Sequence, residues 1–335
     1  MPKQAVLLLA HGTPATVEQI PEYLRNVVSG RPIPQHLVDE IKDRYTQIGH
    51  SPLTEITLQQ GRLVEAELAA SGQPVPVYVG MRNWRPYIPD VVRQMRSDGV
   101  EEAAVICMAP QNSRTSVGLY RRAVEAEGGS LRIHFTEAWA QHPLLAEAFA
   151  ERLRSALSKL SSEVGAPVPV LFTAHSVPTR TIQPPTSVSD GPVATGADPS
   201  RKTEPRLWPS GQGPDPYAEE ARRTAELVAA RVPEISRWWF AFQSQGASGG
   251  PWIGPSVEET LESVAAEGVK ALLLQPIGFL FDHVEILYDV DILFRAFALK
   301  LGMRLERPES LNTSSILVRA VTDLARTGLA ELSSA

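Results

Sequence analysis

Short, continuous apolar runs recur along the chain, and each ends in polar or turn-forming residues. The first is Ala-Val-Leu-Leu-Leu-Ala at 5–10, and a later one is Val-Leu-Phe-Thr-Ala at 170–174. Runs of this length are typical of strands that are buried on both faces of a parallel sheet. Segments with helical periodicity alternate with them, so we expect an α/β fold with helices on both faces of each sheet.

The order of landmarks in the first half of the chain is repeated in the second half. Both runs above end in Ala-His, then a small residue, any residue and proline, which places His11 and His175 at equivalent points. In each half, a second apolar run is followed by prolines and then by a segment with helical periodicity. A Gly-Val pair then precedes a third apolar run and a further proline. These later landmarks are the runs at 77–80 and 239–242 and the prolines Pro110 and Pro276. The repetition indicates an internal duplication.

The duplication predicts two Rossmann-like lobes, at 1–150 and 151–335, with a cleft between them. Ligands of such folds bind beyond the carboxyl ends of the strands, where both Ala-His motifs lie. Residues 184–214 are rich in Pro, Gly, Ser, Thr and Asp, which predicts a flexible insertion. It either folds over the cleft or is a surface insertion without a role. An amphipathic helix at roughly 314–332 is expected to pack back on the body.

Composition excludes several classes of protein. The net charge of −6 has both signs interspersed, whereas a nucleic-acid-binding protein would carry a basic stripe. We find no apolar run long enough for a membrane span and no signal peptide, so we expect a cytoplasmic protein. The only cysteine, Cys107, excludes an intrachain disulfide and a cysteine-held iron–sulfur cluster. We expect it to be a small buried hydrophobic residue.

The segment at 276–291 carries several titratable side chains. A helix is expected to begin near Asp282, and Glu285 follows three residues later, as in a capping box. A helix-capping role alone would explain why a glutamate stands at position 285. However, Glu285 and Asp289 are four residues apart and share a helical face. Carboxylates at this spacing can pass cations inward or hold a proton between them.

His175 is expected at the end of a buried strand, facing the cleft. It is either a structural strand-end histidine or a group that binds a divalent metal or accepts a proton. A site made of His175 and Glu285 would leave some coordination positions of a metal open. Such a site would suit ferrous iron that is bound only briefly before it is delivered. His283 lies near the expected helix start, and we interpret it as a hydrogen-bonded core histidine.

These residues lie in strings that resemble the signatures of the ferrochelatase family. Thr-Ala-His-Ser-Val-Pro at 173–178 is similar to the signature around the catalytic histidine. Gly-Phe-Leu-Phe-Asp-His-Val-Glu-Ile-Leu-Tyr at 278–288 is similar to the signature around the catalytic glutamate. Further matches follow the order of the family at 9–14, 43–45, 48–53, 80–86, 243–246 and 251–255.

The resemblance implies an enzyme of haem biosynthesis that inserts ferrous iron into a porphyrin held between the lobes, with no permanently bound cofactor. It implies that His175 and Glu285 bind the iron and help to remove the two pyrrole protons, with Asp289 as a metal relay. The short segment between the first motifs resembles the coproporphyrin III type, and protoporphyrin IX stays possible. A haem acceptor or the next enzyme of the pathway would be a partner. The implied porphyrin-binding residues are His11, Arg44, Tyr45, Ser51 and Tyr120, with Arg31 as a further candidate.

The chain departs from the family pattern at several positions. His11 stands where coproporphyrin-type enzymes often carry tyrosine, and an imidazole is a competent axial ligand of iron. Leu293 stands where the acidic ladder usually continues, so the ladder is shortened to Asp289. Asn83 and Gln111 stand where related sequences carry histidine, which leaves no basis for an outer metal site.

Three alternatives stay open at this point. One is a chelatase for another tetrapyrrole, such as cobalt or nickel insertion into sirohydrochlorin, although the Asp-His-Val-Glu string favours iron and porphyrin. The second is a noncatalytic haem- or porphyrin-binding protein, which would bind porphyrin without incorporating iron. The third, a dinucleotide-dependent enzyme, is disfavoured because no Gly-x-Gly-x-x-Gly string follows a strand near the start of either lobe.

Overall fold

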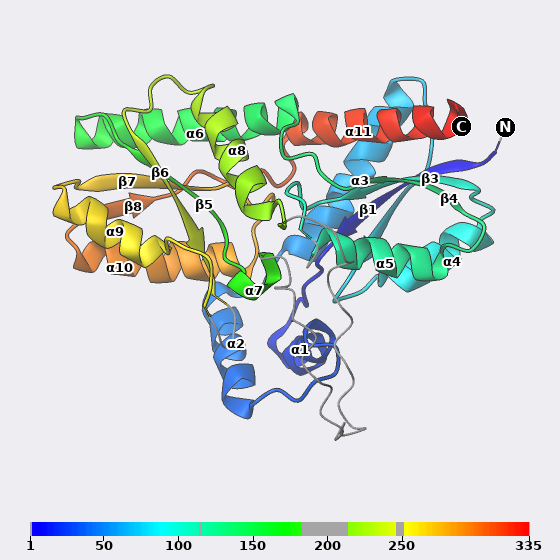
Figure 1. Cartoon of the computed structure of the whole chain (residues 1–335), viewed down its shortest axis with the longest axis horizontal. Coiled ribbons are helices and arrows are strands. Elements are labelled where there is room, and N and C mark those ends of the chain that lie inside the picture. Colours follow the sequence, from blue (N-terminus) through cyan, green and yellow to red (C-terminus); the bar gives the residue numbers. More distant parts are fainter. Residues whose placement is uncertain (1, 114–115, 183–213, 246–250, 335) are drawn as a thin grey trace, which may run out of the picture.

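The computed structural model describes residues 2–113, 116–182, 214–245 and 251–334, so nearly all of the predicted insertion at 184–214 lies outside the described residues. Within them the chain forms two four-stranded, fully parallel sheets with the same strand order, as predicted (Figure 1). The first has the order β2-β1-β3-β4, with β1 (Gln4–Ala10), β2 (Val77–Met81), β3 (Glu102–Cys107) and β4 (Arg132–Thr136). The second has the order β6-β5-β7-β8, with β5 (Val170–His175), β6 (Trp238–Gln243), β7 (Ala271–Pro276) and β8 (Arg304–Glu306).

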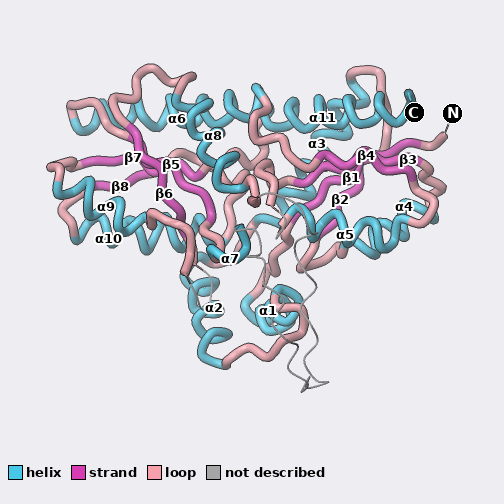
Figure 2. Tube along the Cα trace, in the orientation of Figure 1, coloured by secondary structure: helices cyan, strands magenta, loops and turns pink. Residues whose placement is uncertain are grey.

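Helices cover both faces of each sheet (Figure 2). The first sheet is flanked by α3 (Leu53–Ala70) and α11 (Ser315–Ser334) on one face and by α4 (Ile88–Ser97) and α5 (Val117–Gly128) on the other. The second is flanked by α6 (Pro143–Val164) and α8 (Tyr217–Ala229) on one face and by α9 (Val257–Ala266), η2 (Glu285–Phe294) and α10 (Arg295–Lys300) on the other. The remaining helices are η1 (Val17–Gln19), α1 (Ile20–Val27), α2 (Gln35–Ile48) and α7 (Thr179–Ile182). None of the helices in the described part of the chain has the length and apolar character needed to cross a membrane.

One hydrophobic core joins the two halves. The final helix α11 packs back on the body, where it contacts β3, β4, α3 and α6 of the opposite end of the chain. It continues the layer that α6 begins, along the top of Figure 1. Residues 150 and 151, the expected lobe boundary, lie within α6, and the cluster that contains α6 and α11 has strands of both sheets in it. The two sheets are therefore held together by shared burial of apolar surface.

Backbone hydrogen bonds align the two halves residue by residue. Ala10 pairs with Met81 as Ala174 pairs with Phe242. The next strands agree as well, because Met108 N donates to Leu9 O at 2.7 Å and Ile277 N donates to Thr173 O at 2.8 Å. His11 and His175 therefore occupy equivalent positions, as the sequence predicted.

One predicted landmark pair was wrong. Pro276 pairs with Thr173, and the residue that takes this position in the first half is Cys107, which pairs with Leu9. Pro110 lies three residues beyond Cys107. The two prolines are therefore the same residue type but do not occupy equivalent positions in the two sheets. Cys107 is fully buried, which confirms it as a packing residue, and burial raises the pKa of its thiol to about 12.

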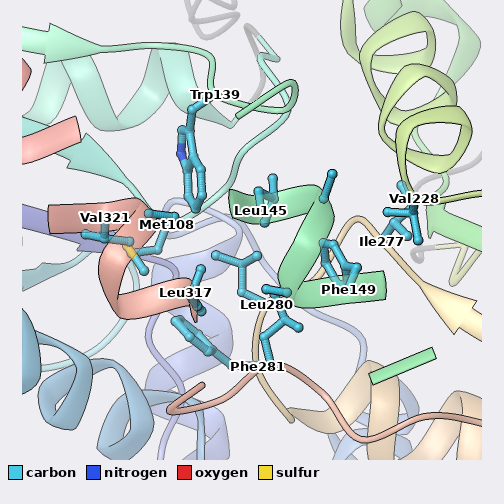
Figure 3. Packing of buried hydrophobic residues seen from close by; sticks show 14 of the residues in the cluster. Met108, Trp139, Leu145, Phe149, Val228, Ile277, Leu280, Phe281, Leu317 and Val321 are labelled. Carbon is cyan, nitrogen blue, oxygen red and sulfur yellow. The ribbon is translucent and has the colours of Figure 1, made fainter. Parts of the chain in front are cut away.

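The segment after β7 is anchored in the shared core. Figure 3 shows Ile277, Leu280 and Phe281 packed among side chains from α6 and α11. Since Phe281 is only four residues before Glu285, this packing fixes the path of the chain into η2.

We expect Leu317→Ala, in α11, to lower the free energy of unfolding by about 2–5 kcal/mol, because Leu317 is completely buried between the two halves. Urea denaturation followed by circular dichroism measures the change. Arg319→Ala, on the exposed side of the same helix, is the matched control and should shift stability by less than about 0.5 kcal/mol. Equal effects of the two substitutions would contradict the shared core.

Candidate active site

A cavity of about 340 Å³ lies where the carboxyl ends of the two sheets meet. Its size falls within the range of small-molecule sites. The first half contributes His11 and Tyr120 to its walls, and the second half contributes His175, Phe279 and Glu285. The structure therefore places the two predicted metal-binding residues on one cavity, opposite residues of the other lobe.

His175 and Glu285 form an ion pair at the cavity wall. His175 is the last residue of β5 and Glu285 is the first residue of η2, and their Nε2 and Oε1 atoms are 3.4 Å apart. The side chains are 30% and 34% exposed, so both can meet a ligand in the cavity. The Nδ1 atom of His175 donates a hydrogen bond to Ser176 O, so the nitrogen that faces Glu285 is the one that can offer a lone pair.

Each member of the pair favours the charged form of the other. Burial opposes the charge of Glu285, but the neighbouring His175, with further help from His283 and His11, lowers its pKa to about 2. Burial likewise opposes the charge of His175, but the Glu285 carboxylate raises the pKa of the imidazole above its ordinary value. An incoming cation would compete with the proton for His175, which couples metal binding to proton release.

His283 orders the start of η2. Its Nδ1 atom accepts a hydrogen bond from the backbone N of Glu285 at 3.0 Å, and burial lowers the pKa of its imidazole. This confirms the prediction of a hydrogen-bonded, buried histidine. The predicted capping box was wrong, because η2 begins at Glu285 and Asp282 accepts hydrogen bonds from side chains of the 307–312 segment instead.

Asp289 lies behind Glu285 on the same helix. Its carboxylate accepts hydrogen bonds from Ser244 Oγ at 2.5 Å and from Arg44 Nη1 at 3.3 Å. Burial raises its pKa to about 6, and the charge of Glu285 adds to this, while Ser244 and Arg44 oppose it. Leu293, at the next step, is 41% exposed. The row of carboxylates thus runs from the cavity to Asp289, as the sequence predicted.

His11 faces the cavity from the other lobe. Its Nε2 atom lies 2.9 Å from the hydroxyl of Tyr23, and Asn83 Nδ2 lies within 3.2 Å of both ring nitrogens. Burial, with the nearby Arg82, lowers its pKa to about 4, so the ring is neutral and keeps one nitrogen lone pair.

The other expected porphyrin contacts are not all at the cavity. Tyr120 lines it and is almost fully buried. Arg44 of α2 instead reaches Asp289 and Glu40. Tyr45 and Ser51 are buried next to one another but do not belong to the described lining of the cavity.

Three cavity residues were missed by the analysis of the sequence. Arg82 lines the wall, with its guanidinium carbon 5.9 Å from the centre of the Tyr120 ring. Phe279 lies edge-on to both His175 and His283. Tyr217 donates a hydrogen bond to His175 O at 3.0 Å. Arg82 and Phe279 lie inside strings that resembled the family, whereas nothing local in the sequence marked Tyr217.

No group of three or more histidine, cysteine or carboxylate side chains is placed to hold a metal ion among the described residues. His175 and Glu285 could offer two protein ligands to a metal ion. A site with two protein ligands leaves coordination positions of the metal open, which suits an ion that must be released again.

The family model for ferrochelatase matches residues 3–329. The chain belongs to the ferrochelatase family. A ferrochelatase of Acidobacterium capsulatum is 57% identical over 331 residues, which cover 98% of this chain and 96% of that protein. A coproporphyrin III ferrochelatase of Mycolicibacterium vanbaalenii is 32% identical over 338 residues, which cover 97% and 89%.

A solved structure of SirB from Bacillus subtilis with Fe³⁺ shares the fold, with a TM-score of 0.55, 12% identity, and coverage of 99% of this chain and 98% of that one. Family membership confirms the predicted activity: the enzyme is a lyase that inserts ferrous iron into a porphyrin in haem biosynthesis. Ferrous iron is accordingly a substrate and not a resident cofactor.

We expect Glu285→Gln to lower the pKa of His175, because the substitution removes the negative charge that holds the proton on the imidazole. Nuclear magnetic resonance titration of the metal-free protein measures this pKa. Asp289→Asn is the matched control and should lower it less, since the charge of Asp289 acts on His175 more weakly than that of Glu285. An unchanged His175 pKa in Glu285→Gln would show that the two side chains do not form an ion pair in solution.

Proposed function

We propose that the enzyme inserts ferrous iron into coproporphyrin III, with His175 and Glu285 as the ligands that present the iron to the ring. The observation that carries this assignment is the approach of His175 Nε2 and Glu285 Oε1 to 3.4 Å at the cavity wall. Relatives that carry the name coproporphyrin III ferrochelatase match nearly the whole chain, which supports this porphyrin over protoporphyrin IX.

His175 and Glu285 can take part both in the delivery of iron and in the removal of the pyrrole protons. Ferrous iron binds the Nε2 lone pair of His175 and an oxygen of Glu285, and the proton of His175 leaves to solvent. The ring then takes the iron and gives up two pyrrole protons. As the iron leaves the pair, His175 Nε2 and the Glu285 carboxylate become free to accept those protons.

Asp289 is placed to carry protons or cations away from Glu285. Its pKa of about 6 lies close to neutral pH, so it can take up and release a proton without a large energetic cost. Ser244 and Arg44 hold its carboxylate in place. We infer that Asp289 assists transfer along the helix, whereas Glu285 is required for it.

His11 and Tyr120 are proposed as porphyrin contacts on the wall that faces His175. Both side chains line the cavity. The missed Arg82 adds a cation on the same wall, and an arginine is well suited to a carboxylate of the porphyrin. The contacts expected for Arg44, Tyr45 and Ser51 stay predictions.

We expect His175→Ala to reduce iron insertion by about 100-fold or more while the porphyrin still binds, because only the imidazole ligand and proton acceptor is lost. Anaerobic turnover with ferrous iron, followed by absorption of the porphyrin, measures the rate, and fluorescence quenching measures porphyrin binding. Comparing coproporphyrin III with protoporphyrin IX in the same assay tests the choice of substrate. Normal turnover by His175→Ala would rule out the assigned role, and faster metallation of protoporphyrin IX would rule out coproporphyrin III as the preferred substrate.

The two carboxylates should differ in their effect on the rate. Glu285→Gln is expected to lose most activity, because it removes a ligand of the iron. Asp289→Asn is expected to lose less, because it removes only a relay group. Steady-state rates at saturating iron and porphyrin give the comparison, and a greater loss in Asp289→Asn would reverse the proposed order.

A further inference from the structure

The helix that carries both carboxylates needs support from outside itself. η2 is a π-helix over Glu285–Phe294, and it is ten residues long. Such helices are rare and mostly confined to a single turn inside α-helices. A run of this length depends on tertiary contacts to keep its geometry, and with it the placement of Glu285 opposite His175.

Arg307 supplies contacts on both sides of the two carboxylates. It lies directly after β8, and its Nε and Nη2 atoms donate to the two oxygens of Asp291, each at 2.8 Å. Nη2 also donates to Asp282 Oδ1 at 3.1 Å. Asp282 precedes Glu285 by three residues, and Asp291 follows Asp289 by two. One guanidinium therefore binds the chain before and after the functional pair.

The remaining donors of Arg307 are also used. Nη1 donates to Pro308 O at 3.1 Å and to Ser310 Oγ at 3.4 Å, and the side chain is only 12% exposed. Asp282 is held further by Ser310 Oγ at 2.7 Å and by Asn312 Nδ2 at 2.8 Å. The segment from 307 to 312 and the start of η2 thus form one hydrogen-bonded unit.

We propose that Arg307 is a positioning residue for iron insertion, which fixes η2 so that Glu285 stays opposite His175. Arg307 does not line the cavity and acts through Asp282 and Asp291. The inference rests on the proposed role of Glu285 as an iron ligand. Buried, bidentate arginine–carboxylate pairs are sensitive to loss of the fork geometry, so lysine is not an equivalent replacement.

Arg304 is the matched control. It lies three residues before Arg307, its side chain is 44% exposed, and it pairs with Glu163 and Glu306 rather than with Asp282 or Asp291. A lysine there keeps the charge on the same loop-and-strand segment and leaves the contacts of Asp282 and Asp291 intact.

The experiment compares Arg307→Lys with Arg304→Lys in the full chain. We expect Arg307→Lys to lower kcat/KM for ferrous iron by about 10-fold to 100-fold, the range typical of residues that orient metal ligands. Porphyrin affinity, measured by fluorescence, should change less than about twofold, because the cavity wall opposite is untouched. Arg304→Lys should match the wild type in both. Assays run well below the melting temperature of each variant keep global unfolding out of the comparison.

Chemical rescue gives a second readout. Guanidinium ion added to Arg307→Gly should restore part of the lost iron insertion, and it should not do so for His175→Ala. If Arg307→Lys keeps wild-type kcat/KM for iron, or loses iron insertion and porphyrin affinity equally, the positioning role is overturned. If Glu285→Gln inserts iron at the wild-type rate, the proposed role of Glu285 fails instead, so the two failures are distinguishable.

Discussion

The ion pair between His175 and Glu285 is the interaction on which the site depends, and the fold brings its two members together from different elements. β5 and β7 are neighbours in one sheet, and the chain leaves β7 against the end of β5. At Gly278 a Cβ would lie 3.0 Å from the Cα and Cβ of Ala174, so a larger residue would push the two segments apart. The apolar side chains that follow Gly278 are buried in the core shared by both halves, and η2 then begins with Glu285 facing the end of β5. Close packing of the core thus sets the distance between two polar groups that lie outside it.

The duplicated fold places a histidine at the end of the first strand of each half, but the surroundings give the two residues different properties. His175 has the Glu285 carboxylate beside it, which raises the pKa of the imidazole and favours the charged form. His11 is surrounded by Tyr23 and Asn83, and burial with the Arg82 cation lowers its pKa to about 4. One backbone position therefore provides an imidazole that favours its charged form on one wall and a neutral imidazole on the other. The difference arises from neighbours that are distant in the sequence.

Local pattern was sufficient for the strands and for the histidines at their ends, but not for the helix that carries the carboxylates or for all of the cavity lining. The composition of the buried runs that end at His11 and His175 predicts parallel strands. The repeated landmarks predict that the two sheets have the same topology. The spacing of Asp282 and Glu285 satisfies a capping box, but Asp282 is occupied by Arg307, 25 residues away, and the helix begins three residues later. That contact and the π geometry arise from tertiary packing, which periodicity does not encode. Arg44 was expected at the porphyrin from the family resemblance, and its contact with Asp289 across the two halves is a further tertiary contact that local pattern does not encode.

The central claim is that iron is first held by one imidazole and one carboxylate at the mouth of a porphyrin cavity. X-ray absorption spectroscopy of the porphyrin-free enzyme, loaded with ferrous iron under anaerobic conditions, tests it most directly. The account predicts the scattering pattern of a single imidazole on the iron in the wild type, and its loss in His175→Ala. Identical spectra for the two proteins would contradict it.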